Sequence, residues 1–353
     1  MNEARLMEFV GKSVADIGAL VNGSLIVIGD KLGLYKAMAG QGSMTSTELA
    51  RRTGHAERYL REWLSAQAAA GYLVYEGSGE DDGDRFSLPD EHAIPLTDET
   101  SPACVIGGFQ LALATVQSTE QLTEAFRTGA GFGWGEHDHE LFEGCERFFG
   151  PSYTAFLTST WIPALDGVEA KLREGGRVAD VGCGQGASTL LLAAAYPNST
   201  VIGFDPHPGS LDAARKRAAD QGLADRVNFE LGTAQDFAGQ FDLVCFFDAL
   251  HDVGDPAGAC AHVLSALTPG GTLMVVEPNA GDRVEDNLNP VGAAYYAFST
   301  MLCTPNSLSQ EVGTALGAQA GEARLREVIT GAGFSSVRRV AETPFNIVLE
   351  ARP

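Results

Sequence analysis

Three aspartates, each at the end of an apolar run, are the residues of this chain best placed to do chemistry. Asp180 ends the run that begins at residue 177, Asp205 ends the next one, and Asp248 ends a third. Such runs, separated by helical stretches, predict strands of a parallel sheet. Because ligands of these sheets bind at the carboxyl ends of the strands, the three carboxylates should converge on one site. Carboxylates there can hold paired hydroxyls or a cationic group.

The turn after Asp180 is rich in glycine and predicts a nucleotide-type ligand. Gly182 and Gly184 stand between a short strand and an alanine-rich helix, where missing side chains let a ligand approach backbone N–H groups. With Ala187 they also satisfy the dinucleotide pattern G-x-G-x-x-G/A, so the glycines alone leave the ligand open. Asp180 would repel a pyrophosphate and favour a zwitterion that carries an ammonium group. Asp205, about 20 residues further on, could grip the ribose of either ligand.

Five motifs between residues 176 and 280 follow one another in an informative order. They read ADVGCGQG, GFDPHPGSLDAAR, GTAQDF, FDLVCFFDALHDVGDP and LTPGGTLMVVEP. Together they resemble the class I S-adenosylmethionine-dependent methyltransferases, and residues 331–352 resemble the closing helix and antiparallel hairpin of that family. The resemblance implies a Rossmann-like α/β domain, S-adenosyl-L-methionine as cofactor and methyl transfer as the reaction.

The resemblance also implies a cofactor site. It places Asp180 and the backbone of 182–186 near the methionine moiety, Asp205 on the ribose, 234–236 near the adenine, and Asp248 at the methionine end. The full set of predicted cofactor residues is Asp180, Gly182, Cys183, Gly184, Gly186, Asp205, Pro206, Ala234, Gln235, Asp236 and Asp248.

Some of these roles have alternatives. The motif GTAQDF lacks an acid directly after Gly232, so Gln235 and Asp236 both remain candidates for the adenine amino group. The three strand-end aspartates also have structural alternatives: the first could cap the glycine turn, the second could be a helix N-cap, and the third could fix its loop.

A hydroxyl or phenol acceptor would need a general base, and histidine is the usual one near neutral pH. His251, in LHDVGDP, resembles the catalytic histidine of plant-type O-methyltransferases, which carry a similar His-Asp pair. It could equally pack beside the adenosyl group and cap its turn. His137, Asp138 and His139 are adjacent and lack a distant third ligand, which is a weak metal pattern. We therefore expect no metal.

Aromatic residues predict an apolar acceptor pocket. The stretch 131–165 is dense in them, and residues 279–322 form an excursion at the carboxyl edge of the sheet where ~2–6 residues would suffice. We expect the excursion to be a lid over the acceptor, although it could merely cover the sheet edge or join a dimer. The predicted pocket residues are Trp134, His139, Phe142, Phe149, Tyr153, Tyr295 and Phe298.

The first 100 residues predict a mostly helical winged-helix domain. Apolar residues from Val10 to Leu32 recur at helical spacing, with a break or two expected at Gly18, Gly23 or Gly29. The elements expected next are a helix over 46–54 opened by the capping box of Thr45 and Glu48, a helix over 56–71, and strands over 72–76 and 85–88. The order resembles the winged-helix domain of actinobacterial two-domain methyltransferases, in which it mediates dimerisation.

Acidic residues argue against DNA reading by this domain. The arginines that could meet phosphates are Arg51, Arg52, Arg58 and Arg61, and the carboxylates that oppose them are Glu57, Glu62, Glu80, Asp81, Asp82 and Asp84. Because a phosphate-facing wing would hardly carry carboxylates at its tip, we expect dimerisation or packing instead.

Composition and net charge limit the partners and the cellular compartment that we expect for this chain. The net charge of −22 makes nucleic acid a poor partner, no signal peptide or membrane span is evident, and six scattered cysteines suit a reducing cytoplasm. We expect three regions: 1–100, a helical connector over 101–175, and the catalytic domain over 176–353. The predicted function is a cytoplasmic, homodimeric methyltransferase of a small, largely apolar molecule, most readily at oxygen. The alternatives are a winged-helix regulator that senses S-adenosylmethionine without catalysis, and an NAD(P) oxidoreductase, which Asp180 disfavours.

Overall fold

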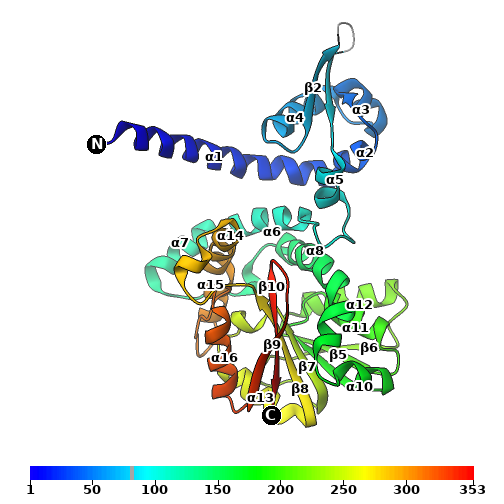
Figure 1. Ribbon diagram of the computed structural model, residues 1–353, viewed down its shortest axis with the longest axis vertical. Coiled ribbons are helices and arrows are strands. Elements are labelled where there is room, and N and C mark those ends of the chain that lie inside the picture. Colours follow the sequence, from blue (N-terminus) through cyan, green and yellow to red (C-terminus); the bar gives the residue numbers. More distant parts are fainter. Residues whose placement is uncertain (80–82) are drawn as a thin grey trace. The chain divides into compact units, whose positions relative to one another are not determined.

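The computed structural model describes residues 1–79 and 83–353, which divide into two compact units, Met1–Leu113 and Ala114–Pro353. Figure 1 labels the elements of both units, and each unit has its own hydrophobic core. The residues predicted to form a connector, 101–175, fall on both sides of this division. Most of them therefore belong to the unit that carries the glycine turn.

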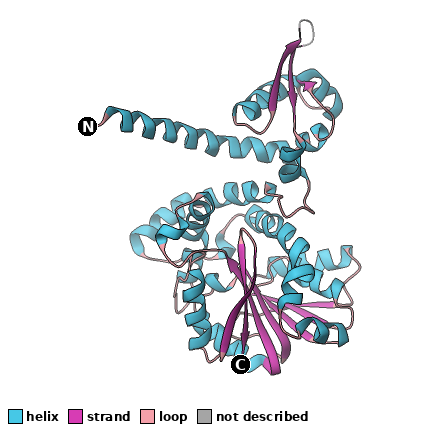
Figure 2. Cartoon of the chain, viewed as in Figure 1, coloured by secondary structure: helices cyan, strands magenta, loops and turns pink. Residues whose placement is uncertain are grey.

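The second unit is built on one sheet of seven strands. Its strands are β4 (Arg177–Val181), β5 (Thr200–Asp205), β6 (Val227–Leu231), β7 (Phe241–Phe247), β8 (Leu267–Pro278), β9 (Ser336–Glu342) and β10 (Asn346–Arg352). Their order is β6-β5-β4-β7-β8-β10-β9 (Figure 2). The strands β4 to β8 pair in parallel, and β10 is antiparallel to both neighbours. The predicted parallel sheet with a closing antiparallel hairpin is confirmed.

Helices cover both faces of this sheet (Figure 1). The α-helices of the unit, after α6 (Ile106–Val116) at the division, are α7 (Thr119–Thr128), α8 (His139–Phe156), α9 (Ile162–Ala164), α10 (Val168–Glu174), α11 (Ala187–Ala195), α12 (Pro208–Asp220), α13 (Pro256–Ala266), α14 (Pro290–Phe298), α15 (Thr304–Leu308) and α16 (Gly321–Gly331). The short 3-10 and π turns are η1 (Trp134–Glu136), η2 (Leu157–Trp161), η3 (Leu250–Asp252), η4 (Val284–Asn287) and η5 (Ser299–Cys303).

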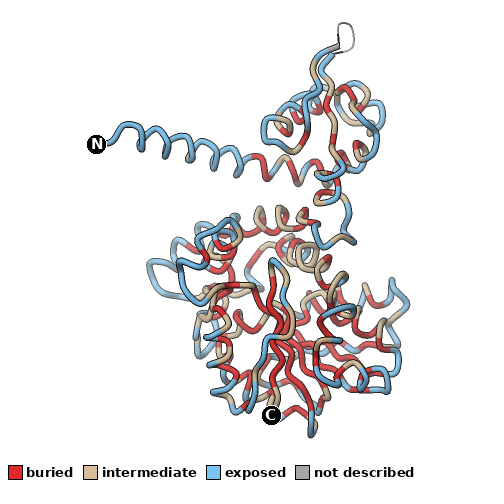
Figure 3. Tube along the Cα trace, viewed as in Figure 1, coloured by how far each residue is buried: buried red, intermediate tan, exposed pale blue. Residues whose placement is uncertain are grey.

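The central strands are apolar throughout because both of their faces are buried. Along β7, Leu243, Cys245 and Phe247 pack into one core cluster, whereas Val244 and Phe246 pack into the other. This alternation follows from the two-residue period of a strand. Helices α10, α11 and α12 complete the first cluster, and α13 and α16 complete the second. Figure 3 shows these strands as the most continuously buried part of the unit.

The excursion over 279–322 is mainly helical. It contains η4, α14, η5 and α15, and its helical turns run on from Pro290 to Leu308 with a π turn over Ser299–Cys303. Asn289 caps α14 by accepting from the Gly292 N–H at 2.9 Å. The excursion connects β8 to α16 at the carboxyl edge of the sheet.

The first unit consists of α1 (Glu3–Lys31), α2 (Leu34–Met38), β1 (Met44–Thr45), α3 (Ser46–Thr53), α4 (Glu57–Ala69), β2 (Val74–Gly79), β3 (Gly83–Ser87), α5 (Asp90–Thr97) and most of α6. Its three-stranded sheet has the order β1-β3-β2. The predicted capping box opens α3, since Thr45 Oγ1 accepts from the Glu48 N–H and Glu48 accepts from the Thr45 N–H. The predicted winged helix is confirmed.

Helix α1 differs from the prediction because it is unbroken over 29 residues. A Cβ on Gly29 would lie 2.6 Å from the Trp63 ring and 2.8 Å from the Tyr35 ring, so this glycine permits close packing. A Cβ on Gly18 would meet nothing within 4 Å. Glycine within a helix costs only about 1 kcal/mol, and the remaining apolar residues propagate the helix through these positions.

Most of α1 leaves its apolar side chains exposed (Figure 3). The exposed large apolar residues of this helix are Leu6, Met7, Phe9, Val10, Val14, Ile17, Leu20, Val21 and Ile28. By length and composition it is also the one helix among the described residues that could cross a membrane, and a core helix of a soluble protein or a signal sequence passes the same test. A patch of this extent indicates an interaction surface.

The wing is formed by β2 and β3, whose ends differ by one to three residues from those of the predicted strands. Of its acidic residues, Asp84 accepts hydrogen bonds from Tyr75 and Ser78. Glu80, Asp81 and Asp82, predicted at the wing tip, lie outside the described residues.

Candidate functional site

A cavity of about 490 Å³ lies at the carboxyl ends of β4, β5 and β7. Its volume is within the range of small-molecule sites, and its position is the one expected for ligands of parallel sheets. The predicted cofactor residues that line it are Gly182, Cys183, Gly184, Asp205, Pro206, Ala234, Gln235 and Asp248. The predicted acceptor residues that line it are Trp134, Phe142, Phe149 and Tyr153. The structure therefore brings both predicted sets together in one cavity.

The glycine turn has the backbone that only glycine adopts readily. Gly182, Gly184 and Gly186 have φ values of +75°, +51° and +88°. A Cβ on Gly184 would meet no protein atom within 4 Å, so a side chain there would occupy the space beside the cavity wall. Gly186 does not line the cavity. Its Cβ would lie 2.9 Å from Phe229, so it allows the close approach of helix and strand.

Asp180 lies behind the turn and does not line the cavity. It is fully buried, and its Oδ2 accepts hydrogen bonds of 2.6 Å from the hydroxyls of Ser188 and Thr189 in the first turn of α11. Burial raises the pKa of Asp180 to about 6. Its Oδ1 has no partner among the described atoms. Asp180 therefore ties the end of β4 to α11, and its contact with the cofactor stays a prediction.

Asp205 accepts hydrogen bonds from two neighbouring segments, whereas the N-cap of α12 is His207 and not Asp205. Its Oδ2 accepts from the Gly184 N–H at 2.9 Å, and its Oδ1 accepts from the His207 N–H at 2.8 Å. It therefore braces the glycine turn and the start of α12, and it also lines the cavity. Each carboxylate oxygen has a second lone pair, so the residue can still accept two ligand hydroxyls.

The loop after β6 places Gln235 and Asp236 differently, and which of them meets the adenine stays a prediction. Gln235 lines the cavity, whereas Asp236 does not. Asp236 turns away to accept from the N–H and the hydroxyl of Thr233, at 2.6 and 2.8 Å. These hydrogen bonds lower the pKa of Asp236 and hold the loop that presents Ala234 and Gln235 to the cavity.

Aromatic rings also line the cavity. Phe142 stacks on His207 with centroids 4.5 Å apart, and Phe149 stacks on Tyr153 at 6.1 Å. The indole N–H of Trp134 donates to Asp252 Oδ2 at 3.0 Å. Helix α8 carries three of these rings on one side, and an ion pair between Glu146 and Arg217 of α12 ties this helix to the cofactor end of the cavity.

Three predicted pocket residues require correction. His139 begins α8 with a side chain 84% exposed, because the turn capped by Asp138 directs it to solvent. Tyr295 is buried and donates to the Phe345 carbonyl at 3.3 Å, and Phe298 is half-buried on the same helix. Neither residue lines the cavity, since α14 directs these rings elsewhere.

The excursion reaches the cavity through Asn306 and Gln310 instead. Asn306 accepts from the Trp134 N–H at 3.1 Å and donates to the Asp252 carbonyl at 2.9 Å. The segment at residues 131–132 also contacts the segment at 305–309 through the backbone. The Phe132 N–H donates to the Pro305 carbonyl at 2.9 Å, and a Cβ on Gly131 would lie 1.9 Å from the Ser309 nitrogen. Nothing in the local sequence distinguishes these polar residues, so the prediction missed them.

Asp248 has an unusual conformation at the end of β7. Its φ is +49°, in the left-handed region that side-chain-bearing residues rarely adopt. Its Oδ2 accepts from the Tyr153 hydroxyl and its Oδ1 from the Asn346 amide, both at 2.8 Å. Burial, followed by the nearby Glu277 carboxylate, raises the pKa of Asp248 to about 7.

His251 is held by a glutamate that the sequence analysis did not single out. Its Nδ1 lies 2.5 Å from Glu277 Oε2, while Glu277 Oε1 accepts from the N–H groups of Leu250 and His251. Burial lowers the pKa of His251, but the carboxylates of Glu277 and Asp252 outweigh it and raise the pKa well above its usual value. The imidazole is 4% exposed and is absent from the cavity wall. Glu277 ends β8, so the rule that identified the strand-end aspartates also applies to it.

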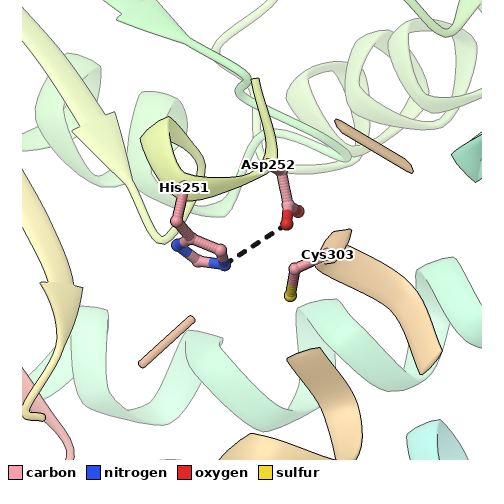
Figure 4. Close-up of side chains that lie close together, drawn as sticks. All are labelled: His251, Asp252 and Cys303. Carbon is pink, nitrogen blue, oxygen red and sulfur yellow. Dashed lines mark ion pairs between the residues drawn. The ribbon is translucent and has the colours of Figure 1, made fainter. Parts of the chain in front are cut away.

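The other imidazole nitrogen faces Asp252 and Cys303 (Figure 4). Nε2 lies 3.3 Å from Asp252 Oδ1, and the three potential ligand atoms lie within 4.8 Å of one another. Among the described residues, this is the one group of three whose atom types and spacing could admit a metal ion. That the protein uses no metal stays a prediction.

Sheet order, glycine turn and acidic strand ends together define a class I S-adenosylmethionine-dependent methyltransferase fold. Residues 172–324 match the family described as a methyltransferase domain, and residues 21–98 match the Rv2258c-like winged HTH domain. Ubiquinone biosynthesis O-methyltransferase of Thiobacillus denitrificans is 30% identical over 188 residues, which cover 50% of this chain and 78% of that protein. The chain belongs to the methyltransferase family.

Other relatives are matched over shorter stretches. Trans-aconitate 2-methyltransferase of Deinococcus radiodurans is 34% identical over 138 residues, or 38% of this chain and 51% of that one. The chain thus spans about half or less of the length of the first curated relatives it matches. Among solved structures, mitomycin 7-O-methyltransferase has a TM-score of 0.68 at 22% identity and covers 99% of this chain and 100% of its own. Human N-acetylserotonin methyltransferase has a TM-score of 0.68 at 17% identity, covering 100% and 98%.

The residues present fit S-adenosylmethionine, the cofactor that this fold implies. The left-handed glycine turn leaves backbone exposed beside the cavity, and Asp205 retains lone pairs for two hydroxyls. Asp180, behind the turn, keeps one buried carboxylate oxygen, Oδ1, without a partner among the described atoms. Gln235 offers an amide at the far end of the same cavity wall.

Proposed function

We propose that this protein is an S-adenosylmethionine-dependent methyltransferase that methylates a small, largely apolar molecule, most readily at a hydroxyl oxygen. The observation that carries the proposal is the single cavity with two unlike walls. One wall has the glycine turn, Asp205 and Gln235, and the other has stacked aromatic rings. The methyl donor and an apolar methyl acceptor would therefore lie in the same cavity, beside apolar side chains that exclude water.

The cofactor supplies an electrophilic methyl group on a sulfonium when it is bound. The protein's own part is alignment and exclusion of water, which can supply roughly 7–11 kcal/mol in favourable cases. Aromatic faces also favour a neighbouring cation. Trp134 closes the wall through its bond to Asp252, and Asn306 holds the Trp134 backbone in place. Either His251 or Asp248, at or just beyond the carboxyl end of β7, would accept a proton from a hydroxyl acceptor.

The charges around the cavity restrict the acceptor. The wall includes Glu146, Asp205, Asp248 and Asp252, of which Glu146 is paired with Arg217. Asp252 also pairs with His251, but carboxylates still outnumber cations at this wall, so anionic acceptors would be repelled and neutral, flat or aliphatic molecules are favoured.

Calorimetry with S-adenosylhomocysteine and with NAD tests the cofactor assignment directly. Binding of the first without the second is expected, and the reverse would contradict the proposal. A thermal-shift screen of neutral phenolic and aliphatic metabolites, run with S-adenosylhomocysteine bound, would then supply candidates. Mass spectrometry of each candidate after incubation with S-adenosylmethionine would show whether one methyl group has been added.

A regulatory role for the winged helix is not favoured. Arg58 pairs with Glu62 at 2.6 Å and Arg61 with Glu57 at 2.8 Å, so carboxylates on α4 neutralise the arginines that would meet phosphates. A gel shift at low salt tests this reading, and sequence-selective binding would favour the regulator.

We also propose that the protein is a cytoplasmic homodimer, paired through the exposed apolar face of α1. All six cysteines are free, which suits a reducing compartment. Val14 and Ile17 are each 63% exposed near the middle of this face. Changing both to Asp is expected to convert a dimer to a monomer at micromolar concentration, as measured by light scattering. Lys12→Glu, on the same helix, is the matched charge control and should leave the mass unchanged; a wild-type monomer would contradict the proposal.

A further inference from the structure

We infer that His251, Asp252 and Cys303 form a binding site for a zinc ion beside the cavity. The inference goes beyond the proposed function and does not depend on the methyl acceptor. It also departs from the sequence-based expectation of no metal, because only the fold brings Cys303 of η5 to the two residues of η3 (Figure 4). Imidazole, carboxylate and thiolate are the three kinds of side chain that bind zinc in proteins.

The spacing of the three ligand atoms fits a zinc ion. His251 Nε2 and Asp252 Oδ1 lie 3.3 Å apart, and Cys303 Sγ lies within 4.8 Å of both. Nitrogen and oxygen ligands with bonds of about 2.0–2.2 Å at the tetrahedral angle lie about 3.3–3.5 Å apart. Asp252 Oδ1 is buried and has no hydrogen-bond partner among the described atoms, so its contact with the imidazole lacks hydrogen-bond geometry. Two polar atoms that approach so closely without a hydrogen bond suit a common third partner.

The surroundings of His251 suit a metal ligand. Glu277 Oε2 lies 2.5 Å from Nδ1 and accepts the proton of that nitrogen, which leaves Nε2 as the ligating atom. The other oxygen of Glu277 accepts from the backbone N–H groups of Leu250 and His251, so the carboxylate is itself held in place. A carboxylate on the outer nitrogen is the usual support of a zinc-bound histidine.

Asp252 and Cys303 are also held in position. Asp252 Oδ2 accepts from the indole N–H of Trp134 at 3.0 Å, and this hydrogen bond leaves Oδ1 for an ion. Cys303 is the last residue of the π turn η5, and such turns are frequent at functional sites. The helix that follows is tied to η3 by Asn306, whose amide donates to the Asp252 carbonyl at 2.9 Å. The two elements that carry the ligands are therefore fixed to each other.

The types of ligand select zinc and similar transition metals. Thiolate and imidazole suit these ions, whereas magnesium and calcium require oxygen ligands. His251 and Cys303 are buried, but Asp252 belongs to the cavity wall, so an ion can enter through the cavity. When zinc binds, the S–H bond of Cys303 breaks, the sulfur keeps the electron pair and bonds the metal, and the proton passes to solvent. A water molecule can fill the fourth position of the tetrahedron.

Titration of the untagged, full-length protein with zinc, after a chelator has removed any metal, tests the inference. One zinc ion per chain should bind, and magnesium should not. Cys303→Ala and His251→Gln should each lower zinc affinity at least 100-fold, because loss of an outer-shell partner already costs about 10–100-fold. Cys104→Ala is the matched control, since it removes a buried cysteine from the core of the other unit, and it should bind zinc as wild type does.

Cobalt(II) in place of zinc reports on the sulfur ligand itself. A thiolate bound to cobalt gives a charge-transfer band in the near ultraviolet. This band should appear in wild type and in Cys104→Ala, and it should be absent from Cys303→Ala. Glu277→Gln keeps all three ligands, so it should weaken zinc binding about 10–100-fold and still show the band at saturating cobalt.

A wild-type protein that binds no zinc would overturn the inference. So would a Cys303→Ala protein that binds zinc as tightly as wild type or keeps the cobalt band. Circular dichroism checks that each variant is folded, and if His251→Gln is not, Cys303→Ala decides the outcome. Failure of wild type to bind S-adenosylhomocysteine would instead contradict the proposed function and leave the zinc result intact, which keeps the two failures distinct.

Discussion

The two ends of the cavity are built in different ways. The cofactor end consists of backbone and carboxylates from three neighbouring strand ends, all within residues 180–248. The acceptor end consists of side chains from α8, η1 and the excursion, which are separated by more than half of the unit's sequence. The first end is a property of local chain geometry, whereas the second depends on how distant elements pack. Mutations should therefore damage the two ends in separable ways.

Among the variants that test this comparison, Gly184→Val should cause the largest loss, and the loss should be in cofactor affinity. The residue has a φ of +51° and its missing side chain borders the cavity, so valine would occupy ligand space as well as strain the turn. We expect at least a 100-fold loss of S-adenosylhomocysteine affinity by calorimetry. Gly222→Val is the matched control, because Gly222 has a φ of +69° and open surroundings outside the cavity. Equal losses in both variants would show that strain alone is responsible.

Asp205→Ala should have the next largest effect, a tenfold or greater loss of cofactor affinity. The change removes the acceptor of two ligand hydroxyls and also the brace on the Gly184 N–H. Asp212→Ala removes an exposed carboxylate of α12 that lies outside the cavity and should change the affinity less than threefold. Wild-type affinity in a folded Asp205→Ala protein would refute the ribose assignment.

Trp134→Phe should act on the acceptor end alone and by a smaller amount. It keeps an aromatic ring but removes the hydrogen bond to Asp252, worth about 0.5–1.5 kcal/mol, so the acceptor KM should rise roughly two- to tenfold. Cofactor affinity should stay within twofold. Phe298→Ala, which changes an aromatic ring outside the cavity wall, should leave the acceptor KM unchanged. If Phe298→Ala raised the KM as much as Trp134→Phe, the boundary of the acceptor end drawn here would be wrong.

The comparison also explains what could be predicted from the sequence. Strand-end aspartates and glycines at left-handed positions are fixed by their immediate neighbours, so Asp205 and Gly184 were found where expected. The orientation of Asp180 depends on two hydroxyls in α11, which form no recognised pattern with it.

The errors at the acceptor end have a common physical origin. An apolar helix can present any of its faces to a cavity, and packing of the whole unit decided that the rings of Tyr295 and Phe298 lie elsewhere. Asn306 could not have been selected from sequence, because its partner Trp134 is 172 positions away along the chain.

The contact between Gly131 and the backbone at Ser309 has a consequence for protein synthesis. One side of this contact lies near residue 309. A ribosome must therefore translate nearly the whole chain before the segment around Gly131 can pack against it. Contacts between residues so far apart in sequence form late in folding, because closing the long intervening loop costs conformational entropy. The nascent protein should thus be able to order its glycine turn while its acceptor wall is still open. A truncation before residue 300 would expose this apolar wall to chaperones and proteases.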